Sequence, residues 1–333
     1  MNQDVVTLDY GSGGSRTAQL IEEVLLPAFQ NDVLSQLGDG AVLELSGPLV
    51  FSTDSFVVDP IFFPGGDIGK LSVCGTVNDV AMCGGVPKYL SLSFIIEEGF
   101  PFADLRRIVT SIAETARGCG VSVVTGDTKV VERGHGHGIY INTSGIGRLA
   151  HPGLSPANIR AGDKVILSGS MGDHGTAVML ARSGLLEGNE LVSDCMPLHR
   201  LAAAALECGG VRVLRDPTRG GVATTLNEFV NGGSLSIELD ETALPVNDAV
   251  RSACDMLGLD PLYIANEGKL LAVVAPDKTQ EVLDALRSCP GGEQAAVIGA
   301  VTEAHPGYVT LNTLLGGSRI LSKLSGAQLP RIC

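Results

Sequence analysis

Residues 62–82 read FFPGGDIGKLSVCGTVNDVAM, and this stretch contains the clearest change of backbone structure in the chain. Pro64 and the two glycines after it are typical of a turn, and the apolar residues that follow recur at helical spacing. We therefore predict a helix over residues 67–82. Its apolar stripe would consist of Ile68, Leu71, Cys74, Val77 and Ala81. Asn78 and Asp79 are expected on the flank of this stripe.

Strand-like and helix-like segments alternate on both sides of this helix, which is typical of an α/β or α+β fold. Strands are predicted over residues 41–45, 49–53, 88–98, 121–125 and 139–149, and a helix over residues 102–119. A polar, turn-rich linker follows at 151–163, and the alternation restarts with a strand at 164–168. A chain of 333 residues also favours two domains. We therefore predict domains over residues 1–150 and 151–320, with a tail over 321–333.

The composition is that of a folded, acidic protein without extracellular features. The formal net charge is −14, and no block of Lys and Arg could follow the phosphates of a nucleic acid. The eight cysteines form no C-x-x-C pair and no zinc spacing, which is typical of reduced thiols in a cytoplasm. No signal peptide and no apolar run long enough to cross a bilayer are recognisable. We therefore expect a cytoplasmic protein with neither a nucleic-acid nor a membrane partner.

Two glycine-containing motifs are candidates for phosphate binding, and neither matches a standard nucleotide fingerprint. Residues 10–16, YGSGGSR, have Arg16 where a Rossmann fingerprint has its third glycine. The pair Gly69-Lys70 resembles the end of a P-loop, but the first glycine and the Ser/Thr of that motif are missing. A Walker A motif is therefore excluded. Residues 10–16 are expected to form a flexible loop whose backbone N–H groups could surround phosphates.

Four aspartates stand beside glycine or small polar residues near the ends of predicted elements: Asp39, Asp54, Asp79 and Asp127. Carboxylate oxygens are ligands that Mg²⁺ prefers, and this ion completes its shell with water and phosphates. Asp127 and Lys129 belong to the motif TGDTK, which we place at the carboxyl end of the predicted strand 121–125, where open α/β sheets bind ligands. The sequence therefore predicts ATP binding through carboxylate-held Mg²⁺ and without a P-loop.

The charged loop RDPTRGG at residues 215–221 has two interpretations. Asp216 and Thr218 could cap the helix that we predict directly after it. Alternatively, Arg215 and Arg219 could form an anion site beside the N-terminus of that helix.

Three other polar segments also leave two interpretations open. His135 and His137 are either a metal pair or part of a solvated hairpin. Residues 266–269, NEGK, precede a predicted apolar strand, and charged groups in that position are usually solvated. The final residues, PRIC, are either a frayed terminus or a tail that carries the thiol of Cys333 as far as the tail reaches.

Eight motifs, taken in chain order, resemble the HypE family of [NiFe]-hydrogenase maturation factors, within the superfamily of aminoimidazole ribonucleotide synthetase. They are GSGG at 11–14, STDSFVVDP at 52–60, FFPGGDIGKL at 62–71, GTVNDVAM at 75–82, TGDTKVV at 125–131, RDPTRGG at 215–221, NEGK at 266–269 and the terminal PRIC. The resemblance covers essentially the whole chain. It implies a two-domain PurM-like fold with a flexible C-terminal tail. In this family the N-terminal sheets of a homodimer pair into a barrel, and ATP binds near that interface.

The resemblance also implies an activity, that of a carbamoyl dehydratase. A carbamoyltransferase, HypF, places a carbamoyl group on the terminal thiol, here Cys333. ATP then drives dehydration of the S-carboxamide to a thiocyanate, which supplies cyanide to the hydrogenase iron through a HypC–HypD complex. The resemblance implies that Glu267 is the general base and that Lys129 lies beside the substrate. The nucleotide-binding candidates are Gly11, Ser12, Gly13, Gly14, Asp39, Asp54, Lys70, Asn78, Asp79, Gly126, Asp127, Arg215 and Arg219, with the four aspartates as Mg²⁺ ligands.

Two other classes of function stay open at this point. One is a superfamily sibling, such as selenophosphate synthetase or thiamine-monophosphate kinase, that acts on a free small molecule. A selenophosphate synthetase needs a reactive Cys or selenocysteine near its N-terminus, whereas the first cysteine here is Cys74, inside a predicted helix. The other class is a non-catalytic scaffold that presents its tail to partners. ATP turnover on the carbamoylated protein distinguishes a dehydratase from a scaffold.

Overall fold

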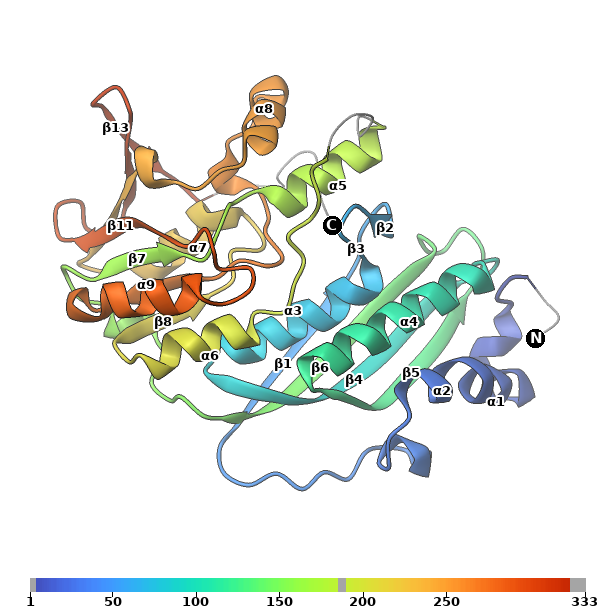
Figure 1. The fold of residues 1–333 in the computed structure, drawn as a ribbon. Coiled ribbons are helices and arrows are strands. Elements are labelled where there is room, and N and C mark those ends of the chain that lie inside the picture. The colour runs from blue at the N-terminus through green and yellow to red at the C-terminus, as the bar shows by residue number, and fades with distance from the viewer. Residues whose placement is uncertain (1–3, 185–189, 324–333) are drawn as a thin grey trace.

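The structure is a computed structural model that describes residues 4–184 and 190–323 of the chain. Two units lie side by side, and each is built on one sheet (Figure 1). Cys333 and the rest of the tail from residue 324 lie outside the described residues. Within the described ranges, no helix combines the length and the apolar character that a membrane span needs.

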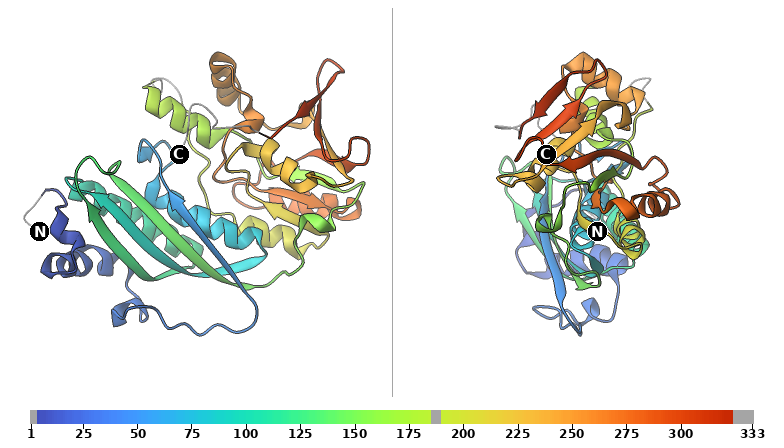
Figure 2. Two further views of the ribbon diagram at one scale, coloured as in Figure 1. Left: turned by 180° about the vertical axis from the view of Figure 1, so that it is seen from behind. Right: turned by 90° about the vertical axis from the view of Figure 1, so that its left-hand side faces the viewer.

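The N-terminal unit contains a four-stranded sheet with the order β1-β6-β4-β5. Its strands are β1 (Leu49–Phe56), β6 (Ile139–Leu149), β4 (Gly85–Glu97) and β5 (Ser122–Val131). β4 and β5 are parallel, and the other two pairings are antiparallel. Helices α3 (Ile68–Met82) and α4 (Phe102–Cys119) cover one face, and the view from behind shows the strands of the other face (Figure 2). In the described part of a single chain, β1 and β5 are the edges of this sheet.

Smaller elements complete the N-terminal unit. A two-stranded ribbon, β2 (Phe62–Phe63) and β3 (Gly66–Asp67), precedes α3. Helices α1 (Ser15–Leu20) and α2 (Leu26–Phe29) are joined by one wider helical turn, Ile21–Leu25, and α2 packs near β5.

Helix α3 is buried on nearly every side, because α4 and the sheet cover it within its own unit and the C-terminal unit covers its other end. Of its 15 residues, only Lys70 and Asp79 are not buried. Asp67 caps its N-terminus by accepting hydrogen bonds from the backbone N–H groups of Gly69 (2.7 Å) and Lys70 (3.0 Å). A Cβ at Gly69 would lie 2.7 Å from the carbonyl oxygen of Ile108, so the close approach of α3 and α4 requires a glycine there. The predicted helix is confirmed, but its buried surface extends beyond the single apolar stripe that we predicted.

The C-terminal unit contains a seven-stranded sheet with the order β13-β12-β9-β11-β7-β10-β8. Its strands are β7 (Lys164–Leu167), β8 (Val211–Arg215), β9 (Ser236–Asp240), β10 (Leu271–Val274), β11 (Ala296–Thr302), β12 (Val309–Asn312) and β13 (Ser318–Leu321). Its helices are α5 (Asp173–Ser183), α6 (His199–Glu207), α7 (Gly221–Val230), α8 (Asp248–Leu257) and α9 (Thr279–Arg287). Only β9 and β12 pair in parallel.

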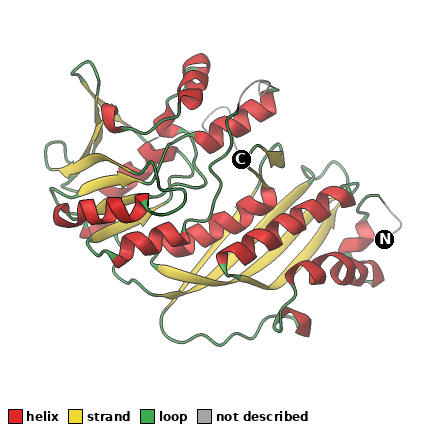
Figure 3. Ribbon diagram, in the orientation of Figure 1, coloured by secondary structure: helices red, strands yellow, loops and turns green. Residues whose placement is uncertain are grey.

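Helices cover both faces of this sheet, as its alternating side chains require (Figure 3). Val165 and Leu167 belong to the cluster that contains the apolar residues of α7, whereas Ile166 between them belongs to the cluster of α6 and α9. Ala81 and Met82 at the end of α3 join this second cluster. The two units therefore share apolar packing through α3 and α6.

The predictions of long, periodic elements are confirmed, and two predictions about strands are wrong. The helix predicted over residues 102–119 and the strand predicted over 139–149 have the bounds of α4 and β6. The predicted strand 41–45 is not formed, because no described strand pairs with it, and Val42 is 84% exposed. Residues 126–129 lie inside β5 and not beyond its end, because their pairing with β4 continues through them.

The cap on α3 leads to a prediction about stability. Asp67→Ala should lower the free energy of unfolding by about 1–2 kcal/mol, because two backbone N–H groups at the start of a buried helix lose their acceptor. Asp67→Asn is the matched control, since its amide oxygen still accepts a hydrogen bond and most of the stability should be retained. Urea unfolding followed by circular dichroism measures both variants. Equal losses for Ala and Asn would show that the cap is not the source of the effect.

Candidate active site

A cluster of charged side chains lies where β1 and α3 meet the C-terminal unit. Asp54 is in β1, Asp79 is in α3, and Asp216 and Arg219 are in the loop between β8 and α7. The guanidinium of Arg219 lies 3.9 Å from Asp54 Oδ1, and the hydroxyl of Ser52 donates a hydrogen bond to Asp79 Oδ2 at 2.6 Å. We call Asp54, Asp79 and Asp216 the interdomain cluster.

Two carboxylates of the interdomain cluster, Asp79 and Asp216, have raised pKa values. Burial raises the pKa of Asp79, and the charge of Asp54 acts in the same direction. Burial raises the pKa of Asp216 to about 7, and the charge of Asp79 is the next cause. Arg215 lies close enough to oppose both shifts, although its own ion-pair partner is Glu228 at 3.4 Å. A buried group of carboxylates with raised pKa values is a place where a cation would be stabilised.

The sequence interpretation of Asp216 as a helix cap is wrong. Helix α7 begins after Gly220, and no side chain caps it. The carboxyl group of Asp216 is instead buried, with Asp79 as its nearest electrostatic neighbour among the acidic residues. The sequence around Asp216 could not reveal its proximity to Asp79, because Asp79 lies 137 positions earlier in the chain.

Glu267 faces the interdomain cluster from the C-terminal unit. It lies in the turn before β10 and is half-buried. Burial raises its pKa well above the usual range, and the neighbouring Cys195, Asp216 and Asp194 add to the shift. A carboxylate with a raised pKa is a stronger base than an exposed one, so this position suits removal of a proton from a weak acid.

A second group of predicted residues lies at the outer edge of β5. Gly11, Gly13, Gly126, Asp127 and Lys129 line one cavity of about 360 Å³, and two glycines on either side of Asp39 line it too. The ammonium of Lys129 lies 3.3 Å from Asp127 Oδ1, and both side chains are exposed. We call this group the β5 cluster.

The sheet keeps the two clusters apart within one chain. β1 and β5 are separated by β6 and β4, which at about 4.8 Å per strand spacing amounts to roughly 14 Å. The two clusters also lie on opposite faces of the sheet. Asp54 pairs in register with Thr143, which contacts α3, whereas Asp127 pairs with Ser93, which lines a pocket on the uncovered face.

Within one chain, the four aspartates predicted as Mg²⁺ ligands therefore lie in two separate groups. Asp54 and Asp79 lie in the interdomain cluster, and Asp39 and Asp127 lie at the β5 cluster. Across the described ranges, no three His, Cys, Asp or Glu side chains are spaced to hold a metal ion.

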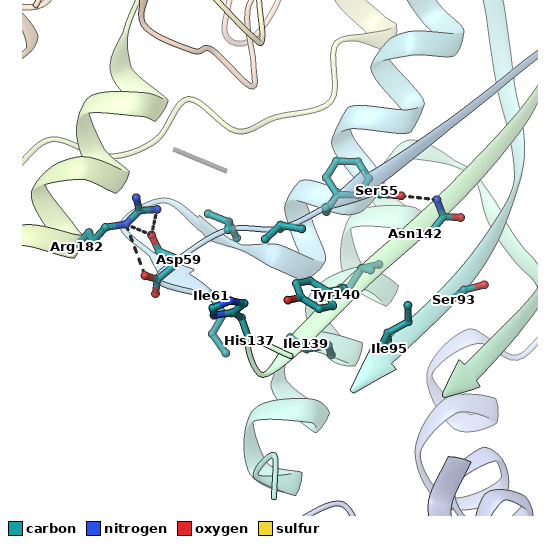
Figure 4. Close-up of a pocket in the computed structure, with 14 residues that line it drawn as sticks. Ser55, Asp59, Ile61, Ser93, Ile95, His137, Ile139, Tyr140, Asn142 and Arg182 are labelled. Atoms are coloured by element: carbon teal, nitrogen blue, oxygen red, sulfur yellow. Dashed lines mark hydrogen bonds and ion pairs between the residues drawn. The ribbon is translucent and has the colours of Figure 1, made fainter. Parts of the chain in front are cut away.

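A larger pocket, about 950 Å³, opens on the uncovered face of the N-terminal sheet (Figure 4). At one end Arg182 of α5 donates a hydrogen bond to the carbonyl oxygen of Asp59 at 2.8 Å. At the other end the amide of Asn142 donates to Ser55 Oγ at 3.0 Å. Ser93 and Ile95 of β4 line this pocket, and Ile95 pairs in register with Lys129 of β5. The volume is within the range of pockets that enclose nucleotide-sized ligands.

Two predicted nucleotide-binding residues make contacts within the protein. The ammonium of Lys70 donates to the carbonyl oxygen of Gly65 at 2.9 Å. The side-chain amide of Asn78 donates to the carbonyl oxygen of Met196 at 3.2 Å and accepts from the backbone N–H of Leu198 at 2.7 Å. Because both polar atoms of Asn78 are engaged, we interpret it as a link between the two units and not as a ligand.

The histidine pair lies in the connection between β5 and β6, and the predicted hairpin is wrong because β4 lies between these two strands in the sheet. Glu97 accepts hydrogen bonds from the backbone N–H groups of Gly134 (2.6 Å) and Gly138 (2.9 Å), which closes the turn between β5 and β6. His135 is exposed, and its nearest acidic group is Glu132 at 3.9 Å.

Comparison with known proteins places this geometry in a family. The AIR synthase related protein family matches with its N-terminal domain over residues 37–149 and its C-terminal domain over residues 160–312. The carbamoyl dehydratase HypE of Azotobacter vinelandii is 51% identical over 332 residues, which cover 98% of this chain and 97% of that protein. The chain belongs to the HypE family.

Solved HypE structures have the same fold. A crystal structure of HypE in complex with ATP matches with a TM-score of 0.94 and 50% identity, covering 98% of this chain and 99% of that one. A HypE–HypF complex matches with a TM-score of 0.80 and 47% identity, covering 92% and 99%. The HypE family therefore accounts for the two-domain PurM-like architecture.

The seven cysteines that lie in the described ranges are all free.

The raised pKa of Asp216 leads to a prediction about pH. Because its pKa rises from 3.8 to about 7 on folding, the unfolded chain is ionised between these values while the folded protein holds a proton. Stability is therefore lost as the pH rises through this window. Asp216→Asn removes the penalty, and without nucleotide it should raise the free energy of unfolding at pH 8 by about 2 kcal/mol. At pH 5 the gain should be smaller. Urea unfolding at both pH values measures it, and a loss of stability at pH 8 would contradict the burial of this charge.

Proposed function

We propose that this chain is an ATP-dependent carbamoyl dehydratase that converts the S-carboxamide on its own Cys333 to a thiocyanate. The observation that carries the proposal is the placement of Glu267, a base with a raised pKa, against the buried carboxylates of the interdomain cluster. Identity of about half to proteins named carbamoyl dehydratase HypE supports the same activity, over that of a sibling kinase or a scaffold.

The chemistry needs two steps. The amide oxygen is a poor leaving group, so it first attacks the γ-phosphate of ATP; an O–P bond forms and ADP leaves. One of the two N–H protons of the amide is released in this step, which leaves an imidoyl phosphate. A base then removes the second N–H proton, the C–O bond breaks, phosphate leaves and the C≡N bond forms. We assign the removal of that proton to Glu267, because its pKa is raised and it faces the interdomain cluster. Arg219 beside Asp54 would hold phosphate oxygens during the first step.

The interdomain cluster could bind Mg²⁺ together with the phosphates of a nucleotide. Asp54, Asp79 and the buried Asp216 offer carboxylate oxygens as ligands, and the described residues do not form a closed cage for the ion. Mg²⁺ commonly binds one or two carboxylates together with the phosphates of a nucleotide. When bound here, Mg²⁺ would neutralise charge on the transferring phosphoryl group. Asp54 and Asp79 would hold it.

We propose that the complete site forms across a homodimer. β1 and β5 are free edges of the same sheet among the described strands, and free edges favour pairing with another chain. Pairing of β5 with β1 of a second copy would close the two sheets into a barrel with two-fold symmetry. It would also bring Asp127 and Lys129 of that copy toward Asp54 of the first chain. This arrangement would place side by side the two strands that carry these residues, which a single chain keeps apart.

The partners follow from the same chemistry. HypF would carbamoylate Cys333, which the HypE–HypF complex of relatives supports. A HypC–HypD complex would then accept the cyanide. The free cysteines support a reaction in the cytoplasm, where thiols stay reduced. Residues 321–333 would carry the substrate between these sites.

The test of the function follows the mass of the intact protein. After incubation with HypF, carbamoyl phosphate and ATP, Cys333 should gain a carboxamide and then lose water. Glu267→Gln should bind ATP and gain the carboxamide normally, but lose water about 10²–10⁴-fold more slowly, because the general base is missing. Normal water loss by Glu267→Gln would remove this residue from the mechanism. Absence of water loss in the unaltered protein would favour the scaffold.

The composite site leads to a separate prediction. Lys129→Ala and Glu267→Gln should each be nearly inactive, but their 1:1 mixture should regain about a quarter of the normal rate, because half of the exchanged dimers contain one intact site. A matched mixture of Glu267→Gln with Asp54→Ala should stay inactive, since both changes fall on the same half-site. The rate of water loss after subunit exchange measures both mixtures. No recovery in the first mixture would mean that each chain contains its own complete site.

A further inference from the structure

A short segment before α6 contacts both units and the Glu267 turn. Residues 193–198, which we call the clasp, run beside α3 toward α6 (Figure 1). The backbone N–H of Ser193 donates to the carbonyl oxygen of Pro64 at 2.8 Å, and that of Leu198 donates to Asn78 Oδ1 at 2.7 Å. The clasp is therefore fixed to the N-terminal unit at both of its ends.

Asp194, in the clasp, binds three consecutive residues of the Glu267 turn. Its Oδ1 accepts a hydrogen bond from the backbone N–H of Glu267 at 3.2 Å, and its Oδ2 accepts one from that of Gly268 at 3.2 Å. The ammonium of Lys269 lies 3.6 Å from Oδ2. The side chain of Asp194 is 2% exposed and that of Lys269 is 9% exposed. Because both charges are buried, the geometry of this pair is sensitive to the loss of either partner.

The backbone of the clasp presses directly on the same turn. A Cβ at Gly268 would lie 1.8 Å from the carbonyl oxygen of Asp194, so only glycine fits there. The hydroxyl of Ser193 accepts from the backbone N–H of Cys195 at 3.0 Å and lies 2.8 Å from Nδ1 of the buried His174. These contacts fix the backbone on both sides of Asp194, and they therefore limit the directions in which its carboxylate can point.

We propose that Asp194 is a positioning residue for Glu267, which aims the general base by holding the backbone of its turn. The proposal rests on the proposed function, because it takes Glu267 to be the base. The turn is also held before β10 by Asn266, whose amide donates to the carbonyl oxygen of Pro217, and by the backbone N–H of Met196, which donates to the carbonyl oxygen of Glu267 at 3.4 Å. Asp194 supplies the acceptors for the two backbone N–H groups in between.

Asp194→Asn tests the proposal with little change of shape. An amide has one acceptor oxygen, so one of the two backbone N–H groups would face an NH₂ group and lose its partner. The turn should rotate and displace the Glu267 carboxylate. Misplacement of a catalytic group by about 1 Å can cost on the order of 10²-fold in rate. We expect kcat for water loss to fall by about that factor, with KM for ATP unchanged.

Two further variants keep the test interpretable. Asp194→Asn leaves Lys269 without its counter-ion, so Asp194→Asn/Lys269→Met removes both charges and should still be slow if hydrogen bonding to the turn matters. Asp163→Asn is the matched control. Asp163 is 1% exposed, accepts from the backbone N–H of Arg160 at 2.8 Å and lies 3.3 Å from Arg212, far from the Glu267 turn in the same unit. Its kcat should stay within about two-fold of normal, as expected for an independent site.

The double variant Asp194→Asn/Glu267→Gln distinguishes a positioning role of Asp194 from a general disturbance of the structure. If Asp194 acts through Glu267, then Asp194→Asn added to Glu267→Gln should cause no further loss of kcat, whereas independent effects would multiply. The inference is overturned if the losses multiply, if Asp194→Asn keeps a normal kcat, or if Asp163→Asn is equally slow. If Glu267→Gln itself loses water at the normal rate, Glu267 is not the general base and the inference is overturned with it. The proposed function fails only if the unaltered protein does not lose water, which is a distinct result.

Discussion

The burial of helix α3 is the constraint on which the site depends. Asp67 fixes where the helix begins, and α4 fixes its distance from the rest of the N-terminal unit. Its C-terminal end packs with α6 and α9 of the other unit. Because the helix cannot shift without opening both cores, the positions of Asn78 and Asp79 on its flank are set. Asn78 then holds the clasp, and Asp79 holds one side of the interdomain cluster.

The N-terminal sheet imposes the second constraint, because it divides the predicted site between its two edges. Asp54 lies on β1 and faces the helices, whereas Asp127 and Lys129 lie on β5 and face away from them. Neither side-chain rotation nor a shift of a loop could join groups that are separated by two strands and a change of face. Pairing with a second copy of the chain would remove the separation by two strands without any change in the fold, and it would also protect two free sheet edges.

The sequence predicted what depends on local periodicity and missed what depends on distant neighbours. The bounds of α4 and β6 were predictable because their apolar residues repeat along the whole element. The segment 41–45 is rich in apolar residues, as a strand would be, but apolar composition does not supply a partner strand. A helix cap was one of two interpretations of the loop that contains Asp216, and neither included its acidic neighbours, because these come from the distant β1 and α3. Asp194 gave no signal, since it lies 73 positions from Glu267, and the role of Glu267 itself came from family resemblance.

Hydrogen exchange at the two edge strands tests the central claim, that a second copy completes the site, most directly. Backbone N–H groups at a free edge exchange quickly, whereas those paired with a neighbouring strand are protected. We predict that residues of β1 and β5 are protected as strongly as those of β4 and β6 at high protein concentration, and that this protection is lost selectively on dilution. Rapid exchange along β1 and β5 at every concentration would contradict a site shared between two copies.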